Sequence, residues 1–160
     1  MTTRIAHALT YPGSLADVAA MLADPAFREE VCAHQGVLRH SVKVTGRGAG
    51  MEVVVDRVHS ADGVPSVARK LVGDEINIVH VERWTDADAA DVTVTIPGKP
   101  GEMSGHITLA EDGDSTVESV TLDVRIGIPL VGGKVERLVA DLMVAALKAE
   151  NRVGRDYLSR

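Results

Sequence analysis

The feature that most constrains the fold is one long amphipathic helix predicted at the C-terminal end of the chain. At 100° per residue, apolar residues fall on one face of this segment and charged residues on the opposite face. The apolar stripe contains Val135, Leu138, Val139, Leu142, Ala146, Ala149, Val153 and Tyr157. A stripe of this length needs a broad apolar surface to cover it, and a curved antiparallel sheet supplies one.

Most of the preceding chain alternates apolar and polar residues, as strands do. Strand patterns cover residues 3–11, 37–45, 51–59, 75–85, 92–96, 103–110 and 116–126. Two short helices are expected after the first strand, because Ser14 with Asp17 forms a capping box and Asp24-Pro25 begins a second helix. A third short helix is expected at 65–72. The pattern predicts an α+β fold in which about seven strands wrap around the terminal helix, as a single domain over residues 1–160.

Composition narrows the classes of function. The 160 residues can bury a sizeable core, and they contain no run of about 18 apolar residues that would span a membrane. The first residues lack a signal sequence and Cys32 is the single cysteine, so we expect a cytoplasmic protein without stable membrane insertion. The net charge is −6 and the basic residues are dispersed, which argues against a nucleic-acid partner. The sequence leaves the oligomeric state open.

The order of elements resembles the helix-grip fold of the START-like, birch-pollen-allergen-like (SRPBCC) superfamily. Four strings carry the resemblance, namely Asp24-Pro25-Ala26-Phe27, residues 65–70 (PSVARK), Glu82-Arg83-Trp84 and residues 128–136 (IPLVGGKVE). Within that superfamily the chain is similar to a family of uncharacterised, mainly actinobacterial proteins, a domain of unknown function. The resemblance implies a deep apolar cavity between sheet and terminal helix. It also implies ligands such as lipids, sterols, polyketides or plant metabolites, and some members are cyclases.

We expect the ligand to lie in that cavity. Small alanines on the helix leave room above the sheet, and Met143 at the edge of the stripe can adapt to an irregular ligand. The predicted ligand-binding residues are His40, Val55, Arg57, Ile78, His80, Glu82, Trp84, Ile107, Leu122, Val124, Leu138, Leu142, Met143 and Ala146. The alternative is ordinary core packing with the cavity collapsed.

Polar residues on apolar strand faces are the second candidate feature. His80 and Glu82 share a parity with Trp84 in residues 75–85, but both faces of this strand are mixed, so the pattern does not decide which face points inward. Arg57 follows three inward-looking apolar residues, and an Arg57–Glu82 pair would anchor a ligand headgroup. Alternatively, these side chains lie near strand ends and reach solvent.

Spacing gives no support for a metal site, a cofactor or a nucleophile. None of the His-x-x-x-His, Glu-x-x-His or Cys-x-x-Cys spacings occurs. Cys32 and His34 are two residues apart on a predicted helix, so they point in different directions. We therefore predict no metal, no cofactor and no catalytic residue.

Three functions follow as hypotheses. The first is binding or transport of a small hydrophobic or amphiphilic, lipid-like molecule. The second is a cyclase or isomerase that uses His80, Glu82 or Arg57 in the same cavity. The third is a non-catalytic protein-interaction domain, for which the hint is that Val144 and Leu147 lie off the main helix stripe.

Overall fold

The computed structural model describes residues 2–62 and 64–160. The strands are β1 (Thr3–Pro12), β2 (Arg39–Thr45), β3 (Glu52–Ser60), β4 (Glu75–Asp86), β5 (Ala89–Thr95), β6 (Glu102–Asp112) and β7 (Ser115–Arg125). The helices are α1 (Leu15–Leu22), α2 (Pro25–Gln35), α3 (Ser66–Val72) and α4 (Gly132–Leu158). The predicted order of elements is confirmed.

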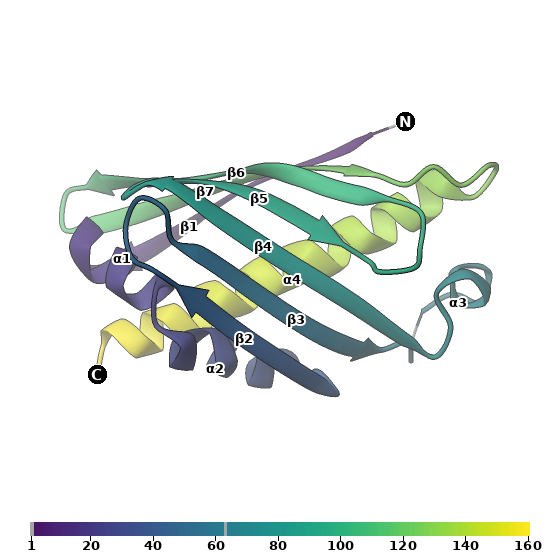
Figure 1. Cartoon of the computed structure of the whole chain (residues 1–160), viewed down its shortest axis with the longest axis horizontal. Coiled ribbons are helices and arrows are strands. Elements are labelled where there is room, and N and C mark those ends of the chain that lie inside the picture. Colours follow the sequence, from purple (N-terminus) through teal and green to yellow (C-terminus); the bar gives the residue numbers. More distant parts are fainter. Residues whose placement is uncertain (1, 63) are drawn as a thin grey trace.

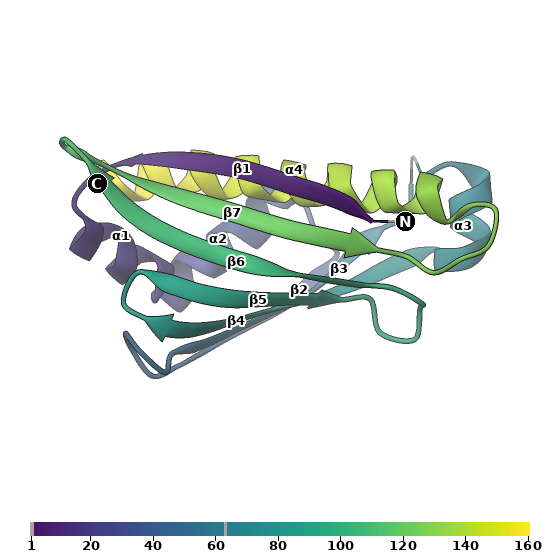
Figure 2. The same cartoon turned by 90° about the horizontal axis from the view of Figure 1, so that it is seen from above.

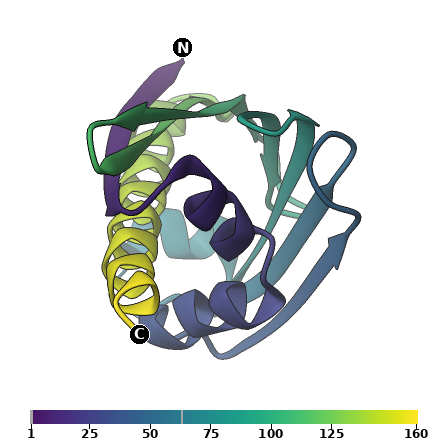
Figure 3. The same cartoon turned by 90° about the vertical axis from the view of Figure 1, so that its left-hand side faces the viewer.

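All seven strands form one antiparallel sheet in the order β1-β7-β6-β5-β4-β3-β2. The sheet curves strongly, and α4 runs obliquely across its concave side (Figures 1 and 2). Seen along the molecule, the sheet, α4 and α2 surround a common interior, and α1 lies at one end of it (Figure 3). This is the helix-grip arrangement that the strand pattern and the terminal helix predicted.

Helix α2 closes the space that the sheet and α4 leave open. Asp24 caps its N-terminus, since the carboxylate accepts the Ala26 amide, and Gly36 ends it in the left-handed conformation that favours glycine. The helix packs against α4 on one side and β2 on the other. Its inner face therefore forms a wall of the interior.

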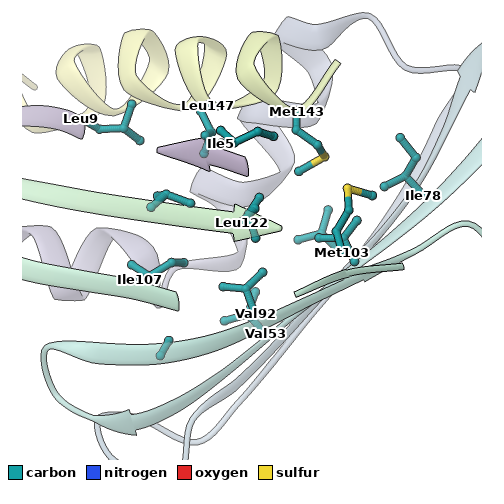
Figure 4. Packing of buried hydrophobic residues seen from close by; sticks show 14 of the residues in the cluster. Ile5, Leu9, Val53, Ile78, Val92, Met103, Ile107, Leu122, Met143 and Leu147 are labelled. Carbon is teal, nitrogen blue, oxygen red and sulfur yellow. The ribbon is translucent and has the colours of Figure 1, made fainter. Parts of the chain in front are cut away.

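The buried face of α4 differs from the predicted stripe. Met143 and Leu147 are buried and point towards residues of the sheet such as Ile78 and Leu122 (Figure 4). Leu138 and Leu142, which the stripe placed centrally, are partly buried. The prediction that Leu147 lies off the stripe is wrong, and Val144 packs partly buried against the core. The inward face of the helix is rotated relative to the predicted stripe, because Glu136 and Glu150, which a hydrophobicity pattern assigns to solvent, face inward.

Candidate functional site

The sheet turns a row of polar side chains towards α4. On β4, Ile76, Ile78, Glu82 and Trp84 are buried, so the face that contains His80 points inward. This settles the ambiguity left by the alternation, because Trp84, Glu82 and His80 share a face as their parity required. On β3, Arg57 follows Met51, Val53 and Val55 into the interior and is 7% exposed.

A buried ion pair joins α2 to β4. Arg28 Nη1 and Nη2 donate to Glu82 Oε2 and Oε1 at 2.7 and 2.8 Å, and Arg28 Nε donates to the Leu22 carbonyl. Burial opposes ionisation of Glu82, but the Arg28 charge and the hydrogen bonds from His80 and Arg28 outweigh it, so the pKa of the carboxyl is lowered. Glu82 is therefore ionised at neutral pH. The predicted partner of Glu82 was Arg57, and that prediction is wrong because Arg28 takes the position.

Glu82 also orients two neighbours on its own strand. Trp84 Nε1 donates to Glu82 Oε1 at 3.0 Å, and His80 Nε2 lies 2.8 Å from Glu82 Oε2. An ionised carboxylate has no proton to give, so Nε2 of His80 is the donor. Nδ1 of His80 is buried and has no hydrogen-bond partner among the described residues. In the neutral ring that nitrogen carries a free lone pair.

A second acidic group lies beside this network. Burial raises the pKa of Glu118 well above its ordinary range, and the neighbouring Glu150 is the next largest cause of this rise. Burial also raises the pKa of Glu150, although Arg28 acts in the opposite direction. Burial raises the pKa of the Tyr11 hydroxyl, and the nearby carboxyls of Glu150 and Glu118 raise it further. Burial at this end of the interior therefore favours the protonated form of Glu118 and the neutral phenol of Tyr11.

Arg57 differs from Arg28 because no carboxylate of the described residues pairs with it. Its Nε donates to His59 Nε2 at 3.2 Å, and its Nη2 approaches Met143 Sδ at 3.9 Å. Among residues 2–62 and 64–160 no carboxylate oxygen lies within 4 Å of its guanidinium, and burial lowers the pKa of Arg57. Burial, with the Arg57 charge, also lowers the pKa of His59 to about 4, so the ring is neutral at pH 7.

These side chains surround a small cavity between α2, β3, β4 and α4. Its volume is ≈ 50 Å³, which is room for a few water molecules. The lining residues are Arg28, Val31, Cys32, Gln35, Val55, Arg57, His80, Glu82, Met143, Ala146, Leu147 and Glu150. The deep apolar cavity that the superfamily implies is thus replaced by a small one with charged walls, because arginine, glutamate and histidine side chains occupy the space.

A larger groove adjoins this cavity on the surface between α2 and α4. Its volume is ≈ 430 Å³, and it shares Gln35 and Ala146 with the cavity. The remaining lining residues are His34, His59, Leu142, Ala145, Lys148, Ala149 and Arg152. The lining of the groove is therefore rich in alanine and also contains exposed basic side chains.

The structure brings together six of the fourteen predicted ligand-binding residues. Val55, Arg57, His80, Glu82, Met143 and Ala146 line the cavity. Ile78, Trp84, Ile107, Leu122 and Val124 are buried in the core outside this lining, and Leu138 is partly buried. Leu142 lines the groove, whereas His40 near the start of β2 is exposed and contributes to neither wall. A role in binding stays a prediction for all of them.

Arg28, Gln35, Glu118 and Glu150 were not among the residues predicted from the sequence. Three signals were nevertheless present. Arg28, Val31, Cys32 and Gln35 follow the 0, 3, 4, 7 spacing of one helix face. Glu118 continues the inward parity of β7 two residues before Val120, and Glu150 follows Leu147 by three residues on α4.

In the part of the chain that the structure describes, no three His, Cys, Asp or Glu side chains are grouped so that they could hold a metal ion. None of the helices there combines the length and the apolar character needed to cross a membrane.

Solved structures define the class of fold. The chain is similar to the Zhui aromatase/cyclase from Streptomyces sp. R1128, with 13% identity, a TM-score of 0.67 and coverage of 100% of this chain and 95% of that one. It is also similar to norcoclaurine synthase from Thalictrum flavum, with 17% identity, a TM-score of 0.60 and coverage of 96% and 86%. Ara h 8.0201 gives 13% identity, a TM-score of 0.64 and complete coverage of both chains. At these identities the likeness shows the fold, which is the helix-grip fold of birch-pollen-allergen-like proteins.

Within that class the family follows from the sequence itself. Residues 6–158 match the family described as "Protein of unknown function (DUF2505)", so the chain belongs to it. A search among curated proteins found no match.

Proposed function

We propose that the protein binds a small amphiphilic molecule between the sheet and α4. The observation that carries the proposal is the convergence of Arg28, Arg57, His80 and Glu82 on a cavity that adjoins an alanine-rich groove. Ligand sites combine apolar walls with a few convergent polar groups, and pockets of 300–1,000 Å³ are usual, so the groove is large enough for the body of a ligand. Proteins of the same fold include an aromatase/cyclase and a synthase, which act on small molecules.

The test is mass spectrometry of the purified protein under native and then denaturing conditions. A mass adduct that is lost on denaturation supports the proposal and identifies the chemical class of the ligand. The matched variants are Ala146→Leu, which enlarges a side chain that lines both the cavity and the groove, and Ala8→Leu, which makes the same change at an exposed position on β1. Retention of the adduct in Ala146→Leu, or its loss in both variants, counts against this site.

Acid–base catalysis in the same cavity is the second candidate, because one nitrogen of His80 is free. Glu82 holds Nε2, so Nδ1 would act as the base, and the Arg57 guanidinium would stabilise the oxyanion that forms when a proton leaves a carbon next to a carbonyl. The hypothesis of a cyclase or isomerase required two of these groups to meet at one enclosed point, and all three line the cavity.

Hydrogen–deuterium exchange tests this candidate without knowledge of the natural substrate. With 2-decanone in heavy water, removal of a proton by His80 and return of a deuteron from solvent would label the positions next to the carbonyl. Labelling by the wild-type protein that His80→Gln abolishes supports catalysis. Equal rates for wild type, His80→Gln and buffer argue against it.

A further inference from the structure

We propose that the ligand is an organic anion whose carboxylate or phosphate pairs with Arg57, and that it enters through the groove between α2 and α4. This inference rests on the proposed function, and it names the chemical class of the ligand. Three independent observations support it. They concern the environment of Arg57, the charge of the groove and the contact between groove and cavity.

The first observation is a buried positive charge without a counter-ion. Arg57 is 7% exposed, and its described partners are the neutral His59 ring and the Met143 sulfur. A buried charge without a partner destabilises the folded state, and an anionic group bound to it would remove this cost. Arg28 in the same cavity shows the contrast, because two hydrogen bonds to Glu82 satisfy its charge.

Glu150 does not remove this need. It faces the same cavity and attracts Arg57 at longer range, but it lies beyond ion-pair distance among the described contacts. Burial raises the pKa of the Glu150 carboxyl, which weakens the counter-charge that it supplies. A bound carboxylate or phosphate would satisfy the guanidinium directly and at short range.

The second observation is the charge of the groove. Lys148, Arg152 and His34 line it, and no acidic residue does so, although the whole chain carries a net charge of −6. Within the described residues neither Lys148 nor Arg152 has a carboxylate oxygen within 4 Å. A basic groove on an acidic protein would attract anions and repel cations.

The third observation is that the groove and the cavity are adjacent. The groove and the cavity share Gln35 and Ala146, and His59 in the groove accepts the hydrogen bond from Arg57 in the cavity. A headgroup at Arg57 would replace the few waters for which the cavity has room. The apolar body of the ligand would then lie on Leu142, Ala145 and Ala149, which are apolar residues of the groove lining.

Titration calorimetry with four ten-carbon probes tests the inference: decanoate, decyl phosphate, 1-decanol and decyltrimethylammonium. We expect the two anions to bind at least about tenfold more tightly than the alcohol, with no binding of the cation. The tighter of the two anions identifies the headgroup. Arg57→Met should weaken anion binding about 10- to 100-fold and change decanol binding by less than about threefold.

The outcomes separate the two levels of the proposal. If decanol binds as tightly as decanoate and Arg57→Met changes both equally, amphiphile binding stands and the anion inference is overturned. If no probe binds, the proposed function fails as well.

Ligand-free Arg57→Met gives an independent measurement. Because this change removes an unpaired buried charge, the melting temperature should rise by about 4 °C or more, and a fall would overturn the account of Arg57.

For the groove, Lys148→Gln and Arg152→Gln should each lower the association rate of decanoate about two- to tenfold at low salt. Arg155→Gln, an equal charge change outside the groove lining, serves as the control, and equal rates for all three variants would exclude this entrance.

Discussion

Replacement of Arg28 by methionine should destabilise the protein strongly, because it leaves the Glu82 carboxylate buried without its counter-ion. The side chains of Arg28 and Glu82 are 7% and 2% exposed, and two hydrogen bonds of 2.7 and 2.8 Å join them. Methionine keeps the aliphatic part of the side chain, so the change removes mainly the charge and its donors. The change acts mainly on Glu82, whose carboxylate must then take up a proton or remain as an isolated buried charge.

The size of the effect follows from the burial of the pair. Removal of one partner of a buried ion pair costs about 3–5 kcal/mol. At about 2–4 °C per kcal/mol for a domain of this length, the melting temperature should fall by about 6–20 °C. Urea unfolding at pH 7, followed by the fluorescence of the single tryptophan, Trp84, measures the loss directly, since its indole donates to Glu82.

A double-mutant cycle and a pH series test the cause. Glu82→Gln in the Arg28→Met background removes the isolated charge and keeps an acceptor for Trp84, so the two changes should couple by about 2–3 kcal/mol. In the wild type the pKa of Glu82 is lowered, so its stabilising contribution is present above the ordinary value of 4.5 and is lost below it. In Arg28→Met, burial without a counter-charge reverses this, and the deficit should narrow as pH falls from 7. A deficit under about 1 kcal/mol, or one that widens on acidification, would refute the reasoning.

Three further predictions concern neighbouring positions. Burial raises the pKa of Glu118, so the contribution of this residue to stability is complete below the ordinary value of 4.5 and is lost as pH rises through the raised pKa. The melting temperature of Glu118→Gln should therefore rise relative to that of the wild type between pH 5 and pH 8. Parallel curves of melting temperature against pH for the two proteins would contradict this. Gly154→Ala would place a methyl group on the Tyr11 ring and should lose about 1–3 kcal/mol in urea unfolding, whereas Gly127→Ala, which meets open space, should not. Cys32 is 1% exposed with its pKa raised by burial, so a disulfide reagent should modify it at least about 100-fold more slowly in the native than in the unfolded protein, and similar rates would show an open interior.

The architecture could be predicted because it follows from the periodic spacing of apolar residues along the sequence. Seven alternating segments and one long amphipathic segment specify the type and order of the elements, and the turn and capping residues mark where many of them end. The rotation of α4 was missed for a physical reason. A hydrophobicity pattern places glutamate in solvent, whereas Glu136 is tied to the Thr3 hydroxyl and the Ile126 amide, and Glu150 lines the cavity.

The polar interior could be predicted only in part. Parity placed His80 and Glu82 on the face of Trp84, and the pattern of residues 51–59 turned Arg57 inward, but the sequence did not decide which face of residues 75–85 points inward. The pairing could not be read from the sequence, because Arg28 and Glu82 are 54 positions apart and meet through the docking of α2. Once Arg28 takes Glu82, Arg57 is left for another anion, and this consequence is visible in three dimensions alone.

The most direct test of the account is a crystal structure of the protein grown with decanoate. The account predicts the carboxylate within hydrogen-bonding distance of the Arg57 guanidinium and the alkyl chain in the groove between α2 and α4. Decanoate bound on the convex face of the sheet, or an interior that excludes it while the ligand is bound elsewhere, would contradict the assignment of this interior as a binding site.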